Sequence, residues 1–307
     1  MRSRPIYVEV RMHVPLERVW KYTQTANLHE RWDLRFTNIE YLPRAEESEP
    51  QRFRYATRIG FGLGIEGGGE SVGESTSEES RSSALRFWSD DSLSLIREGS
   101  GYWKYVKDGD SVRFLTLYDY RVRFGAIGRL VDAFLFRPIM GWATAWSFDR
   151  LRRWLESGQH PESAFRQFAG HALARCAVGF VWLWHGLVPK LVFDHPDEAL
   201  MLTDTGIDSG LANQLVVAAG IFEVAFGLIV LGAWRWRAPL WITLGLMVLA
   251  TVGVAVESSR YLTAAFNPVT LNVQLFVLAA IALLLGRDLP TARNCLRNKP
   301  EFERSPE

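Results

Sequence analysis

The sequence contains only two cysteines, Cys176 and Cys295, and no CxxC pair. Cys176 lies inside a long apolar run and Cys295 lies near the C-terminus. The two are poorly placed to pair, so we predict two free thiols, which fits a reducing compartment. The six histidines show no metal-ligand spacing, and we expect no metal site.

Charge of one sign is lacking as well. The formal net charge is +1. This gives no strong field for a polyanion, and no nucleic-acid partner is expected. The first five residues run directly into an alternating segment, without the apolar stretch of a signal peptide. We therefore expect the soluble part to stay in the compartment where it is made.

Two common motifs are missing, since the phosphate-binding GK[ST] and the metalloprotease HExxH do not occur. Residues 62–67 do match GxGxxG. A dinucleotide site needs a helix directly after this motif, whereas the segment that follows is rich in Glu and Ser and resembles a strand. These glycines are better explained by a bent strand or a hairpin.

Long apolar runs dominate the second half of the chain. Residues 1–167 hold 48 of the 69 Asp, Glu, Lys and Arg residues, so the whole-chain averages combine two unlike parts. About 20 apolar residues in a helix cross a bilayer core. We predict four such spans, at 168–188, 211–234, 238–256 and 269–286. The predicted organisation is a soluble domain (1–158), a linker (159–167), a four-helix transmembrane domain (168–290) and a cytoplasmic tail (291–307).

Arginine and lysine cluster on one side of the four predicted spans. They precede the first span, occupy the loop between the second and third, and follow the fourth, whereas the loop after the first span is mainly acidic. The positive-inside rule then predicts that both termini are cytoplasmic. A bacterial inner membrane is the expected location of this multi-pass chain.

Alternating apolar and polar residues predict strands in the soluble half. Residues 6–14 form the first, and two short helices follow at about 16–23 and 28–32. Asp108-Gly109 marks a hairpin turn. Further strands are expected at 37–42, 52–60, within 65–76, and at 84–90, 101–106 and 112–124.

A long helix should end the soluble half, at about residues 127–157. Apolar residues recur at spacings of three and four along it, which predicts one apolar face for packing on the sheet. The first half of this stripe comprises Ile127, Leu130, Val131, Phe134 and Leu135. Arg137-Pro138 and Gly141 predict a kink.

This order of elements resembles the helix-grip fold of the SRPBCC superfamily, which includes START domains and polyketide cyclases. The resemblance is carried by residues 6–20, 29–33 and 146–151. It implies an α+β domain whose antiparallel sheet wraps the long helix around a cavity for an apolar ligand. Most members have no fixed catalytic signature, so the resemblance says little about chemistry.

Five aromatic residues are candidates for the wall of that cavity: Trp32, Tyr55, Tyr118, Tyr120 and Trp142. The commoner role for such residues is in the core. As a ligand wall, their phenol groups would supply hydrogen bonds. The neighbours His29 and Glu30 could form an acid/base pair, but a solvated helix end is the simpler interpretation.

Ionisable and polar residues inside the predicted spans suggest a second site, because such residues are costly in lipid and face the bundle interior. Glu223 lies near the middle of the second span. Its carboxyl group must be paired, protonated or hydrated. It either forms a hydrogen bond or ion pair that joins two helices, or it is part of a proton or ligand site. The candidate group is His185, Lys190, Glu223, Asn272 and Gln274.

The membrane half resembles the DoxX-like family. The carriers are residues 184–191, with the string His-Gly-x-x-Pro-Lys, the segment 220–227 with Glu223, and the acidic loop 194–208. Relatives are named for association with respiratory or thiosulfate–quinone redox complexes, so this resemblance identifies a module more than a mechanism.

Three functions remain open from the sequence. The first is a binding protein for an apolar small molecule or lipid, with no cofactor. The second is a subunit of a quinone-linked membrane redox complex, with a membrane-protein partner or a second copy of itself. The third is a cyclase-like enzyme in the soluble domain. Membrane lipids are partners under each.

Overall fold

The computed structural model describes residues 4–44, 46, 49–60, 62–257, 259–263, 265 and 267–300. The chain forms two compact units. We call Met1–Ala164 with Pro290–Glu307 the sheet unit, and Phe165–Leu289 the membrane unit.

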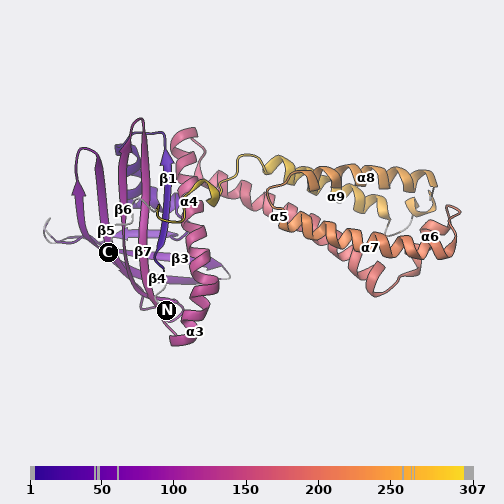
Figure 1. Ribbon diagram of the computed structural model, residues 1–307, viewed down its shortest axis with the longest axis horizontal. Coiled ribbons are helices and arrows are strands. Elements are labelled where there is room, and N and C mark those ends of the chain that lie inside the picture. Colours follow the sequence, from indigo (N-terminus) through magenta and orange to yellow (C-terminus); the bar gives the residue numbers. More distant parts are fainter. Residues whose placement is uncertain are drawn as a thin grey trace. The chain divides into compact units, whose positions relative to one another are not determined.

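Within the described residues, seven antiparallel strands form the sheet of the first unit (Figure 1). Their order across the sheet is β1-β7-β6-β5-β4-β3-β2, so the first and last strands of the sequence are neighbours. The strands are β1 (Ile6–Met12), β2 (Asn38–Tyr41), β3 (Arg52–Gly60), β4 (Leu63–Thr76), β5 (Ser80–Trp88), β6 (Ile96–Asp108) and β7 (Ser111–Val122). The predicted α+β helix-grip architecture is confirmed, and β5 and β6 begin several residues earlier than the pattern indicated.

Two glycine turns connect neighbouring strands as the sequence predicted. Gly109, between β6 and β7, has a φ of 59°. Gly62, between β3 and β4, has a φ of 77°, a conformation that costs residues with a Cβ. The GxGxxG segment is therefore a hairpin turn that leads into a strand, with no helix after it.

Helices cover one face of the sheet, which we call the inner face. The helices of this unit are α1 (Leu16–Gln24), α2 (Ala26–Trp32), α3 (Gly125–Val131), a π-helical turn (Asp132–Phe136) and α4 (Arg137–Ser157). On α4, Phe148 stacks on Phe114 of β7 with ring centroids 4.4 Å apart. Pro138 lies in the first turn of α4, where its missing N–H is tolerated. The irregularity falls just before it, in the π-helical turn.

The prediction that the long helix is apolar toward the core along its whole length was wrong. Its second half is buried, as at Trp146, but Ile127 is 73% exposed and Phe134 is 80% exposed. The helical stretch from Gly125 to Ser157 has 33 residues and is about 50 Å long. The seven-residue strand β1, on which α4 packs, spans only about 23 Å. Even the twelve-residue strand β7 spans only about 40 Å, so the helical stretch extends beyond the strands on which α4 packs.

Residues after the fourth span return to the sheet unit. A 3₁₀ turn (Ala292–Asn294) lies against α4, and Leu296 pairs with Glu9 of β1 through two backbone hydrogen bonds of 2.9 Å. Cys295 is buried there and donates its thiol to the Ala145 carbonyl (3.2 Å). Both cysteines are free thiols, as predicted. The segment expected to be a separate tail thus completes the first domain.

Among the described residues of the chain, four helices are long and apolar enough to cross a membrane. They span Pro161–Val192, Ser209–Gly232, Ala238–Glu257 and Pro268–Leu285. The first comprises α5 (Pro161–His185) and a π-helical turn (Gly186–Val192); the others are α7, α8 and α9. Residues 161–167, expected in a linker, are the first two turns of α5. The short helix α6 (Pro196–Thr203) lies between the first and second spans.

Two side chains in the middle of α5, Arg175 and His171, contact the ends of two other helices in the membrane unit. Arg175 is buried and donates from Nε to the Val230 carbonyl (2.8 Å) and from Nη2 to the Ala233 carbonyl (2.7 Å) at the end of α7. One turn earlier, His171 Nδ1 lies 2.8 Å from the Ala282 carbonyl of α9. Helix ends leave carbonyls without intrahelical partners, and the Arg175 contacts satisfy those at the end of α7 inside the bundle.

Candidate functional site

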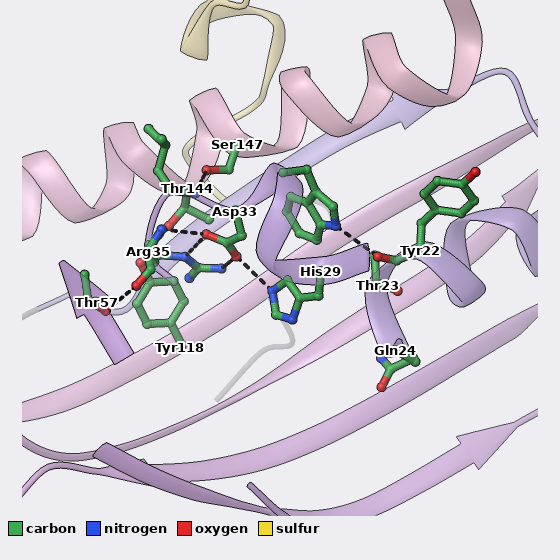
Figure 2. A network of polar contacts seen from close by, with 12 residues as sticks. Tyr22, Thr23, Gln24, His29, Asp33, Arg35, Thr57, Tyr118, Thr144 and Ser147 are labelled. Atoms are coloured by element: carbon green, nitrogen blue, oxygen red, sulfur yellow. Dashed lines mark hydrogen bonds and ion pairs between the residues drawn. The ribbon is translucent and has the colours of Figure 1, made fainter. Parts of the chain in front are cut away.

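A buried ion pair occupies the inner face of the sheet (Figure 2). Arg35 donates from Nε to Asp33 Oδ1 (2.9 Å) and from Nη2 to Asp33 Oδ2 (2.6 Å), which is a bidentate pair. Both residues belong to the segment between α2 and β2. The Leu34 N–H of this segment donates to Ser147 Oγ on α4 (2.9 Å), which fixes its position beneath the helix.

Aromatic rings enclose the charged end of Arg35. Its guanidinium carbon lies 5.5 Å from the ring centroids of both Phe36 and Tyr118, within the range of cation–π attraction. Tyr118 in turn shares a 2.9 Å hydrogen bond with Thr144 of α4. The pair is therefore positioned by β7, α4 and the segment after α2 together, as Figure 2 shows.

The two charges of the pair stabilise each other. Burial alone would raise the pKa of the Asp33 carboxyl, but the Arg35 charge and its hydrogen bonds outweigh burial and hold that pKa well below its usual value. Burial alone would lower the pKa of Arg35, and Asp33 raises it above its usual value. Both groups are therefore ionised, and their summed charge is zero.

His29 extends this network, and its predicted place at a solvated helix end was wrong. The ring is buried, and its Nε2 lies 3.1 Å from Asp33 Oδ2. Burial lowers the pKa of His29 against the opposing effect of Asp33, so the ring is neutral and Nε2 is the donor. Glu30 behaves differently: its carboxylate accepts from the Ile39 N–H (3.2 Å) and makes no acid/base pair with His29.

A row of aromatic residues and glycines runs across the inner face beside this network. Residues paired across antiparallel strands share a face, so the strand register defines the row. We call it the inner row: Tyr120, Gly99, Phe87, Gly69, Phe53 and Tyr41. A Cβ at Gly99 would collide with the Phe87 ring, and one at Gly69 with the Phe53 ring. The rings therefore lie flat over their glycine neighbours.

Exposure rises along the inner row. Tyr120 is buried under the helix, Phe87 and Phe53 are half-buried, and Tyr41, at the β2 edge, is 42% exposed. In contrast, Phe114 under α4 is fully buried. The inner face is thus filled where α4 crosses it and open toward β2 and β3.

The five predicted wall residues have different roles. Trp32 is fully buried between His29, Trp103 and Phe148 and donates Nε1 to the Tyr22 carbonyl (2.9 Å), which makes it a core residue. Tyr118 belongs to the Arg35 network. Tyr120 belongs to the inner row and donates to Asp132 Oδ1 (2.7 Å).

The remaining two wall candidates, Tyr55 and Trp142, have different surroundings. Tyr55 lies beside the inner row over Gly67, with its ring 5.5 Å from Phe36. Burial raises the pKa of Tyr55 to about 12, so its hydroxyl stays protonated and donates to the Trp88 carbonyl (3.2 Å). Trp142 is 40% exposed on α4, on a part of the helix that does not face the core.

An open groove of about 1250 Å³ lies along β3 and β4. Alternation along the strands places most of its lining side chains, including Arg54, Ala56 and Trp88, on the outer face of the sheet. Phe53 and Gly69 of the inner row also line the groove, so it borders the inner row at the β3–β4 edge, but most of its charged side chains lie on the outer face.

The polar group in the membrane unit centres on Lys190. Its Nζ lies 3.1 Å from Glu223 Oε2 on α7 and 3.3 Å from Glu198 Oε2 on α6. Gly186 and Gly220 allow this approach, because a Cβ on Gly186 would lie 2.6 Å from the Gly220 carbonyl. The π-helical turn containing Pro189 carries Lys190 toward both carboxylates.

The structure brings together only part of the predicted intramembrane group. His185 is half-buried and contributes its backbone carbonyl, which lies 3.4 Å from Lys190 Nζ. Asn272 is buried but, within the described residues, makes no polar contact with Lys190 or Glu223. Gln274 is exposed on α9. Glu198, which the sequence analysis left in an acidic loop, is the member it missed.

Sequence reasoning also missed the Arg35–Asp33 pair. The available signal was two opposite charges flanked by Trp32 and Phe36, where a surface turn would be polar throughout. The inner row could not be found this way, because its members come from six strands. Only the strand register places them together.

Comparison with known proteins gives matches in both halves of the chain. Residues 179–280 match the DoxX-like family. Over its N-terminal half the chain resembles the Zhui aromatase/cyclase from Streptomyces sp. R1128, at 13% identity, 51% of this chain, 98% of that one and a TM-score of 0.38. A STAR-related lipid transfer protein from Xanthomonas axonopodis matches at 17% identity, covering 43% of this chain and 77% of that one, with a TM-score of 0.34.

One curated relative covers almost the whole sequence. The uncharacterized membrane protein YndG of Bacillus subtilis is 38% identical over 304 residues, which is 97% of this chain and 99% of the relative. That similarity includes both the sheet unit and the four apolar helices. The chain therefore belongs to the family of membrane proteins that includes YndG, and its membrane unit is DoxX-like.

Proposed function

We propose that the sheet unit of this multi-pass membrane protein binds an apolar small molecule or lipid along the inner row. The observation that carries this proposal is the row itself. Two of its rings, Phe87 and Phe53, lie over glycines of the neighbouring strands. The row is buried at the Tyr120 end, under the helix, and exposed at the Tyr41 end. Flat apolar surface that is only half-buried is stabilised by an apolar partner, at roughly 25 cal/mol per Å² removed from water.

The Arg35 network supports a neutral polar group on that molecule. Arg35 and Asp33 cancel each other's charge, and burial keeps His29 neutral. A ligand anion would have to compete with Asp33 for the guanidinium. A carbonyl or hydroxyl would need only one hydrogen bond, at far lower desolvation cost. We therefore propose an amphiphile with an uncharged polar end and an apolar body.

The membrane supplies the natural source of such a molecule. Under this proposal both termini lie in the cytoplasm of a bacterial cell, and the sheet unit exchanges its ligand with the inner leaflet of the inner membrane. The arginine distribution across the loops supports that orientation. Membrane lipids are then both the surroundings of the membrane unit and candidate ligands of the sheet unit.

Paired substitutions on adjacent strand positions test the binding site. Phe53→Gln and Phe87→Gln make the inner row polar, whereas Arg54→Gln and Arg86→Gln change the next residue, whose side chain is exposed on the outer face. The full-length proteins are purified in mild detergent, and bound organic molecules are identified by native mass spectrometry. We expect the inner pair to lose the bound molecule and the outer pair to keep it. Equal content in all four variants would refute the proposal.

A second candidate function, a quinone-linked redox subunit, is favoured by one observation in the membrane unit. Lys190 joins carboxylates from α6 and α7 within 3.3 Å. An ion pair among membrane helices can stabilise the bundle or form part of a proton or quinone site. Quinone in solvent extracts of the wild type, and its loss in Glu223→Gln, would support this alternative over the first.

A further inference from the structure

A continuous apolar surface is exposed on the first half of the long helix. Its eight large side chains are between 40% and 80% exposed. They are Phe124, Ile127, Leu130, Val131, Phe134, Leu135, Ile139 and Trp142. We call this set the apolar helix surface. Its area is on the order of 1000 Å², above the roughly 300–600 Å² of the largest patch on a typical soluble monomer.

The apolar helix surface also carries little charge, and its exposed charge is positive. Residues 124–142, all of them described, contain three charged side chains. Asp132 is buried, where it pairs with Arg137 (2.9 Å) and accepts from Tyr120. Within this segment Arg129 is left as the exposed charge, and its one carboxylate is buried. Such a surface disfavours water and suits anionic groups.

The same helix holds both points where the sheet unit leads into membrane-spanning segments. Arg150 of α4 donates from Nε to the Pro161 carbonyl (3.0 Å), at the start of α5. Asp149 of α4 accepts from the Thr291 N–H (2.8 Å), just after the fourth span. Both connections to the membrane unit thus leave the sheet unit beside α4.

Helix geometry then gives the distance between the apolar helix surface and the point where the chain enters α5. Phe134 precedes Arg150 by 16 residues, or about 24 Å along the helix. Two short covalent connections hold the unit beside the lipid at high effective concentration, so weak apolar contacts suffice for binding. An apolar helix face with a basic residue and a tryptophan is the composition of helices that lie in the membrane interface.

We propose that the apolar helix surface binds the headgroup and upper acyl region of an anionic bilayer, the one that the same chain spans. The insertion orients the sheet unit on the membrane. This inference rests on exposure and connectivity in the helix, independently of any ligand on the inner row, so either proposal can fail without the other.

Site-specific fluorescence tests the contact in the full-length protein. In a Cys176→Ser background, with buried Cys295 retained, the dye NBD is attached at Phe134→Cys or, as the control, at Arg86→Cys on the outer face of the sheet. Each protein is placed at one copy per nanodisc of phosphatidylethanolamine and phosphatidylglycerol. The quenchers are iodide in water and a doxyl group on the lipid chains.

At position 134 we expect a blue-shifted emission, quenching by doxyl lipid and loss of quenching by iodide; at position 86 we expect the reverse. Ile127→Cys, seven residues earlier in the same helical stretch, is labelled as a second position in case the label at 134 disturbs folding. Equal access of iodide to positions 134, 127 and 86 would overturn the proposal. Protection from iodide without quenching by doxyl lipid would mean that protein covers the surface, and would overturn it as well.

Discussion

Asp149 joins the returning C-terminal segment to α4, and its removal should loosen one part of the protein selectively. The side chain is fully buried. It accepts from the Thr291 N–H (2.8 Å) and from Asn294 Nδ2 (2.9 Å), and also from Arg152 and Arg153 of its own helix. Asp149→Ala leaves all of these donors without their shared acceptor.

The expected loss of unfolding free energy in Asp149→Ala depends on how exposed the partners of Asp149 are. Removing one member of a buried ion pair typically costs about 3–5 kcal/mol. Arg152 and Arg153 keep 25% and 21% of their side chains exposed, so water can solvate them again and the ionic share must be discounted. The two bonds to the C-terminal segment are made to a charged acceptor and carry most of the remainder. We therefore expect a loss of about 3 kcal/mol, the low end of that range.

Hydrogen exchange followed by mass spectrometry can localise this loss, whereas one melting temperature of a two-unit protein cannot. Because about 1.4 kcal/mol corresponds to tenfold, amides of β1 and of residues 291–297 should exchange about 100-fold faster in Asp149→Ala. The amides of α7 to α9 serve as the internal reference. Asn294→Ala, which removes one bond and no charge, should give a smaller change in the same segments. Exchange within threefold of wild type in both segments would refute the reasoning.

Three further predictions concern topology, pH and the intramembrane ion pair. Reporters fused after residues 166, 236 and 300 should read cytoplasmic and one after residue 200 external, and a cytoplasmic signal at 200 would exclude the proposed orientation. Because burial lowers the pKa of His29 below its usual value of 6.5, the unfolded chain binds a proton that the folded one does not. Stability of the sheet unit should therefore fall as pH drops below about 6.5, and a His29→Phe variant with an unchanged pH profile would contradict this assignment. Glu223→Gln removes the charge that faces Lys190 at 3.1 Å, so thermal stability in detergent should fall if the pair only holds α7 in place; unchanged stability with loss of a bound molecule would indicate a site instead.

Local patterns in the sequence determined those features that depend on residues close together along the chain: the spans, the strands, a turn and a helix cap. Long apolar runs predicted four spans because lipid requires every backbone group to be bonded within its helix. Period-two alternation predicted the strands, and Asp108-Gly109 predicted a turn. Asn267, directly before Pro268, is a residue type that typically caps a helix, and its side chain accepts from the Thr270 N–H at 2.9 Å.

Only the tertiary structure decided which surfaces are covered. The stripe from Ile127 to Leu135 has the spacing of a core face, yet it is exposed, because helical period reports apolarity and contains no information about the length of the sheet beneath it. The Arg35–Asp33 pair is buried because Ser147 and Tyr118, more than 80 residues away in sequence, surround it. The inner row exists only through the register of six strands, and the C-terminal segment finds β1 almost 290 residues upstream. Each of these is a contact between distant parts of the chain, and such contacts are set by packing and not by local pattern.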